Sequence, residues 1–119
     1  MDWRSSIKGF KAYLKLERSL SENSIDAYMR DINKLVDYVE QQHPTVSPTK
    51  VDLALLDGFV THLFELGLND RSQARILSGV RAYYRFLLME DMIDHDPTEL
   101  LEGPKVKRKL PDTLSYDEI

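Results

Sequence analysis

The stretch RSQARILSGVRAYYRFL, residues 71–87, decides the class of fold. Its apolar residues recur at intervals of three and four, so on a helix they share one face. Asn69 or Asp70 can cap such a helix at its start, and the pattern fades around Met92. The stretch therefore predicts an amphipathic helix that packs one face against a core. The residues on that face are Ile76, Leu77, Val80, Tyr83, Tyr84 and Leu87.

The same periodicity predicts three further helices upstream. Ser21 is placed to cap the second helix, and His43 ends it because the residue before a proline is disfavoured in the α conformation. Gly67 is placed to terminate the third. No alternating pattern typical of a strand reaches a useful length, so we predict an all-α bundle of four main helices. The three upstream helices are expected from Trp3 to near Arg18, from Ser21 to His43, and from Leu53 to Gly67.

The sequence changes character after residue 102. Asp96-Pro97 predicts a short turn through Leu101, and the Gly103-Pro104 pair then opens an extended basic connector. Ser115 and Glu118 resemble the capping box of another helix start. We therefore expect a helical domain over residues 1–102, and over residues 103–119 a linker followed by the start of a further segment.

Composition limits the possible classes of protein. The chain has 119 residues, of which 42% are apolar and 30% charged, which suits a single domain with one core. Cysteine is absent, so disulfides and thiolate chemistry are excluded. No stretch is long or apolar enough to span a membrane, and we expect a cytoplasmic protein without a membrane partner. The net charge of −4 argues mildly against binding to nucleic acid.

The chain is poorly equipped for catalysis on its own. Its histidines, His43, His62 and His95, are far apart, and no HExxH motif or carboxylate cluster with metal-ligand spacing occurs. Gly-rich phosphate loops and nucleophile elbows are also missing. We therefore predict no catalytic residues, no cofactor, no metal site and no small-molecule substrate for this fragment.

The fourth predicted helix carries a sharper signal in its charges. Four arginines and one serine fall within an arc of about 120°, roughly opposite the apolar face. No acidic residue occurs between Asp70 and Glu90. Like charges at helical spacing repel one another, and a polyanion would relieve that cost. Arginine also suits phosphates and guanine edges, although the alternative is a solvated face that carboxylates of other helices neutralise. The four arginines and the serine of this arc are Arg71, Arg75, Ser78, Arg81 and Arg85.

Several segments together resemble the N-terminal core-binding domain of tyrosine site-specific recombinases, particularly bacterial XerC/XerD-like proteins. Residues 20–24, LSENS, with Tyr28 and Arg30-Asp31, are similar to the second helix of that domain. Residues 71–87 are similar to its fourth helix, and Asp96-Pro97 to the motif that follows. Residues 104–118 resemble the link into the catalytic domain. The resemblance therefore implies that residues 103–119 are a linker with the first residues of a missing catalytic domain.

The resemblance implies a four-helix, SAM-like bundle that sits on one side of duplex DNA, with its second and fourth helices facing the major groove. Other recombinase subunits would join it in a synaptic tetramer. The contacts implied from the second helix are Asn23, Ser24, Tyr28 and Arg30. Those implied from the fourth helix are Arg71, Ser72, Arg75, Ser78 and Arg81, and the charge pattern adds Arg85. Those implied from the linker are Lys105, Lys107, Arg108 and Lys109.

The chemistry that the resemblance implies belongs to the catalytic domain. That domain transfers a DNA phosphoryl group to a tyrosine through a covalent 3′-phosphotyrosine, without a metal. None of its motifs occurs here, and Tyr116 does not match the nucleophile. Met29 also replaces a basic residue that relatives often carry, which suggests that the fragment alone binds DNA weakly.

Two other functions fit parts of the sequence. A non-enzymatic DNA-binding regulator is possible because the third and fourth predicted helices, joined through residues 67–70, resemble a helix-turn-helix. A helical protein-interaction module without nucleic acid is favoured by the acidic pI near 5.3. Recombinase motifs downstream of this chain would separate the first interpretation from both alternatives.

Overall fold

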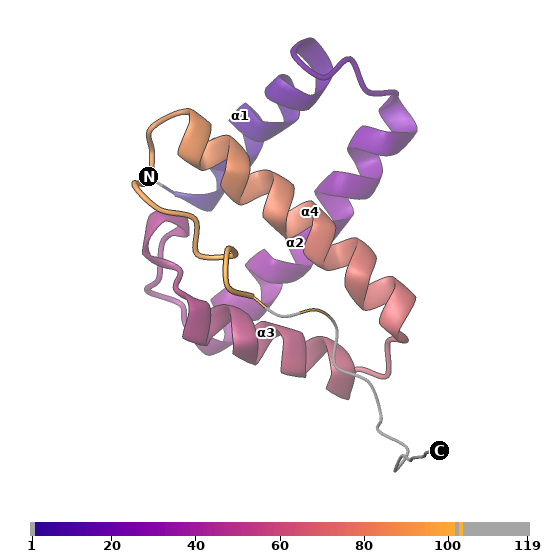
Figure 1. Cartoon of the computed structure of the whole chain (residues 1–119), viewed down its shortest axis with the longest axis vertical. Helices are drawn as coiled ribbons and strands as arrows, with labels where there is room; N and C mark the ends of the chain where they lie inside the picture. The colour runs from indigo at the N-terminus through magenta and orange to yellow at the C-terminus, as the bar shows by residue number, and fades with distance from the viewer. Residues whose placement is uncertain (1, 102, 104–119) are drawn as a thin grey trace, which may run out of the picture.

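The computed structural model describes residues 2–101 and 103. Within them the chain forms four α-helices and one short 3-10 helix, without strands, which confirms the predicted all-α bundle. Helix α4 crosses α2, while α1 lies above the crossing and α3 below it in Figure 1. The elements are α1 (Trp3–Leu16), α2 (Glu22–Gln42), η1 (Pro48–Lys50), α3 (Leu53–Glu65) and α4 (Asp70–Met89).

Each α-helix begins at a residue whose side chain accepts a backbone hydrogen bond. Ser21 caps α2, as predicted, and Asn69 rather than Asp70 caps α4. Asp2 and Asp52 do the same for α1 and α3. Such caps satisfy N–H groups that have no partner inside the helix. The residues around each cap therefore fix where that helix begins.

Two helices end slightly earlier than their apolar patterns suggest. Helix α1 stops at Leu16 and α4 at Met89, rather than near Arg18 and Met92. The physical reason is a residue with left-handed backbone just beyond each end. Ser19 has φ of 51° and Asp91 has φ of 59°, so the chain turns there instead of continuing the helix.

The core forms between all four α-helices, with α3 on its lower side in Figure 1. The predicted apolar face of α4 is buried along its whole length, from Ile76 to Leu87. Two adjacent tyrosines, Tyr83 and Tyr84, are fully buried. The Tyr84 hydroxyl donates a hydrogen bond to the Pro48 carbonyl oxygen (3.0 Å), and the Tyr83 hydroxyl bonds with Ser6 Oγ. Both polar groups therefore have partners, as buried hydroxyls require.

The segment after α4 folds back against the bundle. Asp96 Oδ1 accepts bonds from the Thr98 backbone N–H and hydroxyl, which forms the predicted turn. Thr98 and Leu101 are buried, and an arginine of α4, Arg81, donates from Nη2 to the Leu101 carbonyl oxygen (3.0 Å). The linker and the proposed domain boundary at residues 102–103 fall largely outside the described residues. No helix of the described chain is long and apolar enough to cross a membrane.

Candidate nucleic-acid interface

The N-terminal halves of α2 and α4 diverge from their crossing and leave a hollow of about 170 Å³ between them. We call this the α2–α4 hollow. Four of the six residues that line it are predicted contacts, two from each helix, so the structure brings the two predicted sets together. The lining residues are Ser24, Ala27, Tyr28 and Asp31 from α2, and Arg75 and Ser78 from α4.

The two helices approach each other closely where Gly79 of α4 faces Asp31, one of the residues that line this hollow. A Cβ atom on Gly79 would come within 2.9 Å of the Asp31 Cβ and 3.1 Å of its Oδ2. Real Cβ atoms essentially never approach another atom this closely, so the position requires glycine. Gly79 therefore lets α4 rest directly on Asp31, and this contact sets how far apart the walls of the hollow stand.

An ion pair joins the two walls. Arg75 Nη1 lies 3.2 Å from Asp31 Oδ1, and the two side chains are 53% and 5% exposed. This contact lacks hydrogen-bond geometry, and Oδ1 has no hydrogen-bond partner among the described residues. Burial raises the pKa of Asp31 above its usual 3.8, against the attraction of Arg75, Arg30 and Lys34. The hollow thus holds a buried carboxylate beneath a partly exposed guanidinium.

The predicted contacts on α2 divide between the hollow and its flank. Ser24 and Tyr28 are half-buried in the hollow, and the Tyr28 ring packs edge-on against Phe10, with centroids 6.1 Å apart. Asn23 and Arg30 are exposed and do not line the hollow. Their spacing of seven residues places them together on one flank of the helix.

The predicted contacts on α4 differ in their surroundings. Arg75 and Ser78 line the hollow, and Arg71 is exposed one turn before Arg75. Ser72 is half-buried, and its backbone N–H donates to the Asn69 cap. Arg81 is also half-buried and holds the Leu101 carbonyl.

One further predicted contact on α4 lies beyond the hollow. Arg85 is exposed, more than one turn past the crossing at Gly79. The linker residues fall outside the described part of the chain. For all of these residues, as for those in the hollow, contact with DNA stays a prediction. The linker residues are Lys105, Lys107, Arg108 and Lys109.

The structure also shows basic residues that the sequence analysis did not single out. Lys34 lies close enough to Asp31 to affect its pKa, one turn after Arg30. Helix α1 carries a row of exposed cations, which we call the α1 basic face. Their spacing of four, three and four residues is the signal that could have revealed it. The residues of this face are Arg4, Lys8, Lys11 and Lys15.

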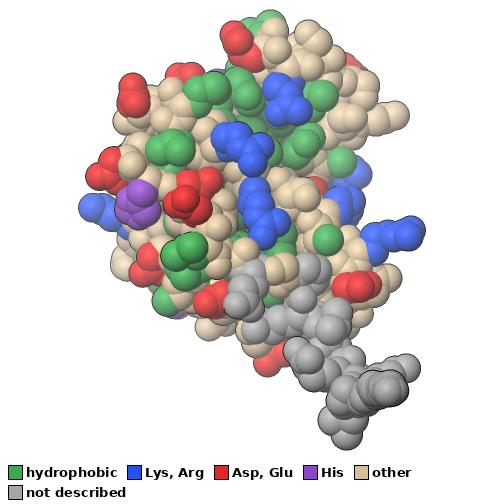
Figure 2. All heavy atoms as spheres, in the orientation of Figure 1, with side chains coloured by type: hydrophobic (Ala, Val, Ile, Leu, Met, Phe, Trp, Pro, Cys, Tyr) green, Lys and Arg blue, Asp and Glu red, His purple; other side chains and the backbone are tan. Residues whose placement is uncertain are grey.

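Positive charge is concentrated unevenly on the surface. Figure 2 shows Lys and Arg side chains down the middle of the viewed face and at its right-hand edge, while acidic side chains gather mainly on the left. A net charge of −4 therefore hides local positive surface. Local charge, rather than net charge, determines where a polyanion can bind.

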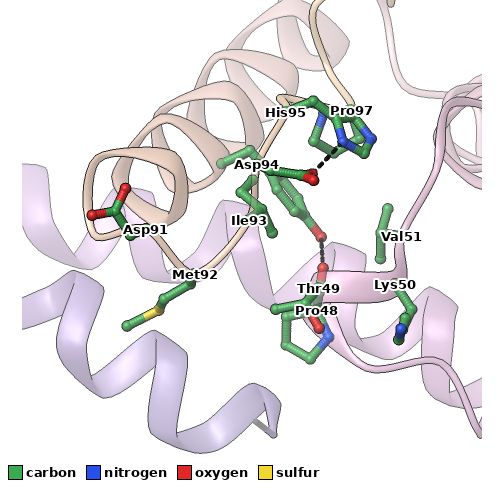
Figure 3. A pocket seen from close by; sticks show the side chains of 11 residues that line it. Pro48, Thr49, Lys50, Val51, Asp91, Met92, Ile93, Asp94, His95 and Pro97 are labelled. Atoms are coloured by element: carbon green, nitrogen blue, oxygen red, sulfur yellow. Dashed lines mark hydrogen bonds and ion pairs between the residues drawn. The ribbon is translucent and has the colours of Figure 1, made fainter.

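A second hollow, of about 470 Å³, lies between the η1 segment and the loop that follows α4. Figure 3 shows the side chains of His95 and Asp94 joined at its rim, with Nδ1 and Oδ1 2.8 Å apart. Hydrogen bonding from His95 lowers the pKa of Asp94. None of the predicted DNA contacts that the structure describes lines this hollow. No group of three or more potential metal ligands occurs within the described residues.

Comparisons with known proteins agree with the resemblance to tyrosine recombinases. Residues 7–91 match the family described as phage integrase, N-terminal SAM-like domain. The chain is 35% identical over 113 residues to tyrosine recombinase XerD of Staphylococcus epidermidis, and equally to that of Staphylococcus aureus strain N315. Each match covers 95% of this chain and 38% of the relative, so the chain spans well under half of the relatives' length. No solved structure gives a significant match.

Proposed function

Since the chain belongs to the family of phage integrase N-terminal SAM-like domains, we propose that it is the DNA-binding domain of a tyrosine site-specific recombinase. In this proposal the α2–α4 hollow faces the major groove of the recombination site. The observation that carries it is that two sets of predicted contacts, Ser24 and Tyr28 from α2 and Arg75 and Ser78 from α4, line one hollow.

The character of this surface supports duplex DNA as the ligand. The major groove of B-DNA admits an α-helix and offers hydrogen-bond acceptors at guanine and adenine edges. Arg71 and Arg30 are exposed beside the hollow, where they can reach phosphates on either side. Serine and tyrosine hydroxyls are further donors to phosphate and base edges.

The chemistry of recombination belongs to the whole protein in this proposal. The chain spans 38% of the length of its XerD relatives, and a catalytic domain beyond it would form the 3′-phosphotyrosine bond. The basic residues 105–109 would follow the DNA backbone toward that domain, and other recombinase subunits would complete a synaptic tetramer. The 119 residues alone would hold DNA without cutting it.

The experiment that tests this proposal measures binding of the chain to duplex DNA at 50 and 200 mM salt. Affinity should fall steeply with salt, because each phosphate neutralised releases counterions and contributes about −0.9 to the log–log slope. Arg71→Glu should weaken binding and reduce that slope by about one unit.

Lys50→Glu is the matched control, since it makes the same charge change at an exposed residue of η1, away from the hollow. It should leave the slope unchanged. Equal slopes for both variants, or no binding even at low salt, would contradict the proposal and favour a protein-interaction module.

A further inference from the structure

The buried carboxylate of Asp31 costs folding free energy at its position. Its side chain is 5% exposed, and the contact with Arg75 Nη1 at 3.2 Å is the only ion pair it forms among the described residues. A buried carboxylate costs free energy unless it is well paired and hydrogen-bonded, and here Oδ1 lacks a hydrogen bond. Packing against Gly79 would be equally satisfied by an uncharged side chain of the same shape. The charge of Asp31 therefore needs a reason other than packing.

The reason lies in what the carboxylate does to Arg75. A free arginine side chain has many rotamers, and fixing them costs entropy when a ligand binds. The contact with Asp31 already holds one end of the guanidinium, while 53% of the side chain stays exposed. The remaining N–H donors of the planar group are thus held at the hollow before DNA arrives.

The Asp31 carboxylate also changes which part of DNA Arg75 is suited to bind. A neighbouring negative charge offsets the attraction of the guanidinium for phosphate, because the pair together is close to neutral. Its directional donors remain, and they match the O6 and N7 acceptors of guanine. Arg71 differs, since it is exposed and forms no ion pair within the described residues, so its full charge is available to phosphate.

Building on the proposed function, we propose that Asp31 is a positioning residue that holds Arg75 for reading a base edge. Arg75 then contributes to sequence discrimination, whereas Arg71 contributes to general affinity. Gly79 contributes to the same arrangement of residues, since its missing side chain lets Asp31 lie beneath α4.

The test selects duplexes from a randomised pool with the unmodified chain, then compares affinity for the most enriched duplex and for a shuffled version of it. Asp31→Asn keeps the shape of the side chain but removes its charge. It should reduce the ratio of the two affinities about fivefold or more, the range expected for one base-edge contact. Affinity for the shuffled duplex should hold or rise, because a negative charge near the DNA has gone.

Two further variants separate positioning from a structural role. Arg75→Lys keeps the positive charge but lacks the planar fork, so it should lose discrimination and keep affinity for the shuffled duplex. In an Arg75→Ala background, Asp31→Asn should change the ratio no further, because the effect passes through Arg75. Asp37→Asn, an exposed carboxylate of α2, is the charge-matched control and should leave the ratio unchanged.

Three results would overturn the inference. Asp31→Asn could leave the ratio intact, or it could weaken binding to both duplexes equally together with a lower melting temperature, which a structural role predicts. The unmodified chain could also bind DNA without enriching any base preference. In these cases salt-dependent binding by the unmodified chain would still support the proposed function, whereas its absence would refute both.

Discussion

Helices α1 and α4 both present basic side chains, and they differ in what lies beside the charge. The α1 basic face is a row of exposed cations along one side of a helix, and none of them forms an ion pair within the described residues. The basic residues of α4 make different contacts from one another. Arg75 contacts a buried carboxylate in the α2–α4 hollow, and Arg81 holds a backbone carbonyl. By charge alone, α1 is the more regular of the two faces.

The comparison teaches that a recognition surface is identified by its surroundings as much as by its charge. A solvated basic face costs little to build, because water and salt screen exposed charges. The α2–α4 hollow contains features that are costly, namely a buried carboxylate and a helix contact that only glycine permits. Costly features at a concave site more often reflect function than chance.

The largest effect should come from the helix contact. Gly79→Ala places a Cβ 2.9 Å from the Asp31 Cβ, so α2 and α4 must separate, at a cost of about 1–3 kcal/mol of folding stability. DNA affinity should fall with it, because the walls of the hollow move. Thermal unfolding and DNA titration of the same preparation measure both.

Gly9→Ala on α1 is the matched control. Its Cβ would meet Phe86 Cζ at 3.4 Å, an ordinary contact, and alanine is the better helix former by about 0.5–1 kcal/mol. This variant should be as stable as the unmodified chain or slightly more stable. Equal destabilisation by both substitutions would show that the close contact at Gly79 has no special role.

A smaller effect should distinguish the two basic surfaces in DNA binding. Arg71→Glu reverses a charge beside the hollow and should lower the salt slope by about one unit, as proposed above. Lys8→Glu makes the same charge change on the α1 basic face and should leave the slope unchanged. A lower slope for Lys8→Glu would mean that DNA also follows α1, and the hollow would then be only part of the interface.

Much of this architecture could be predicted because it is encoded locally. Apolar periodicity placed all four helices, and the Ser21 cap was readable from residue type alone. Helix ends were less predictable, since Ser19 and Asp91 adopt left-handed backbone that neither residue type demands. Resemblance and charge pattern together brought Arg75 and Ser78 into the candidate site.

The rest depended on packing between helices, which a single helical pattern does not contain. The sequence shows Asp31 only as a neighbour of Arg30, and Gly79 only as an isolated glycine inside a helix. Their contact exists because α4 crosses α2 at that point. Arg81 likewise matches the other arginines on a helical wheel, yet its partner is a carbonyl twenty residues later in the chain.

The smallest expected effect concerns pH and two carboxylates with opposite shifts. Hydrogen bonds from Ser5 to the Asp2 cap of α1, together with nearby positive charge, lower the pKa of Asp2, while burial raises the pKa of Asp31. Ionised Asp2 therefore stabilises the fold above pH 3.8, and that contribution is lost as pH falls through its lowered pKa. Asp31 behaves in reverse. Its contribution is complete below pH 3.8 and is lost as pH rises through its raised pKa.

Unfolding free energies of Asp31→Asn and Asp2→Asn, measured by denaturant titration from pH 3 to pH 7, test these opposite signs. At neutral pH, Asp31→Asn should be more stable than the unmodified chain, and Asp2→Asn less stable. Both differences should shrink as the solution is acidified, because the aspartates then become neutral like the asparagines that replace them. If Asp31→Asn were instead less stable at pH 7, the ion pair with Arg75 would outweigh the cost of burial. Asp31 would then stabilise the fold through its charge, and its cost could no longer be cited as evidence of function.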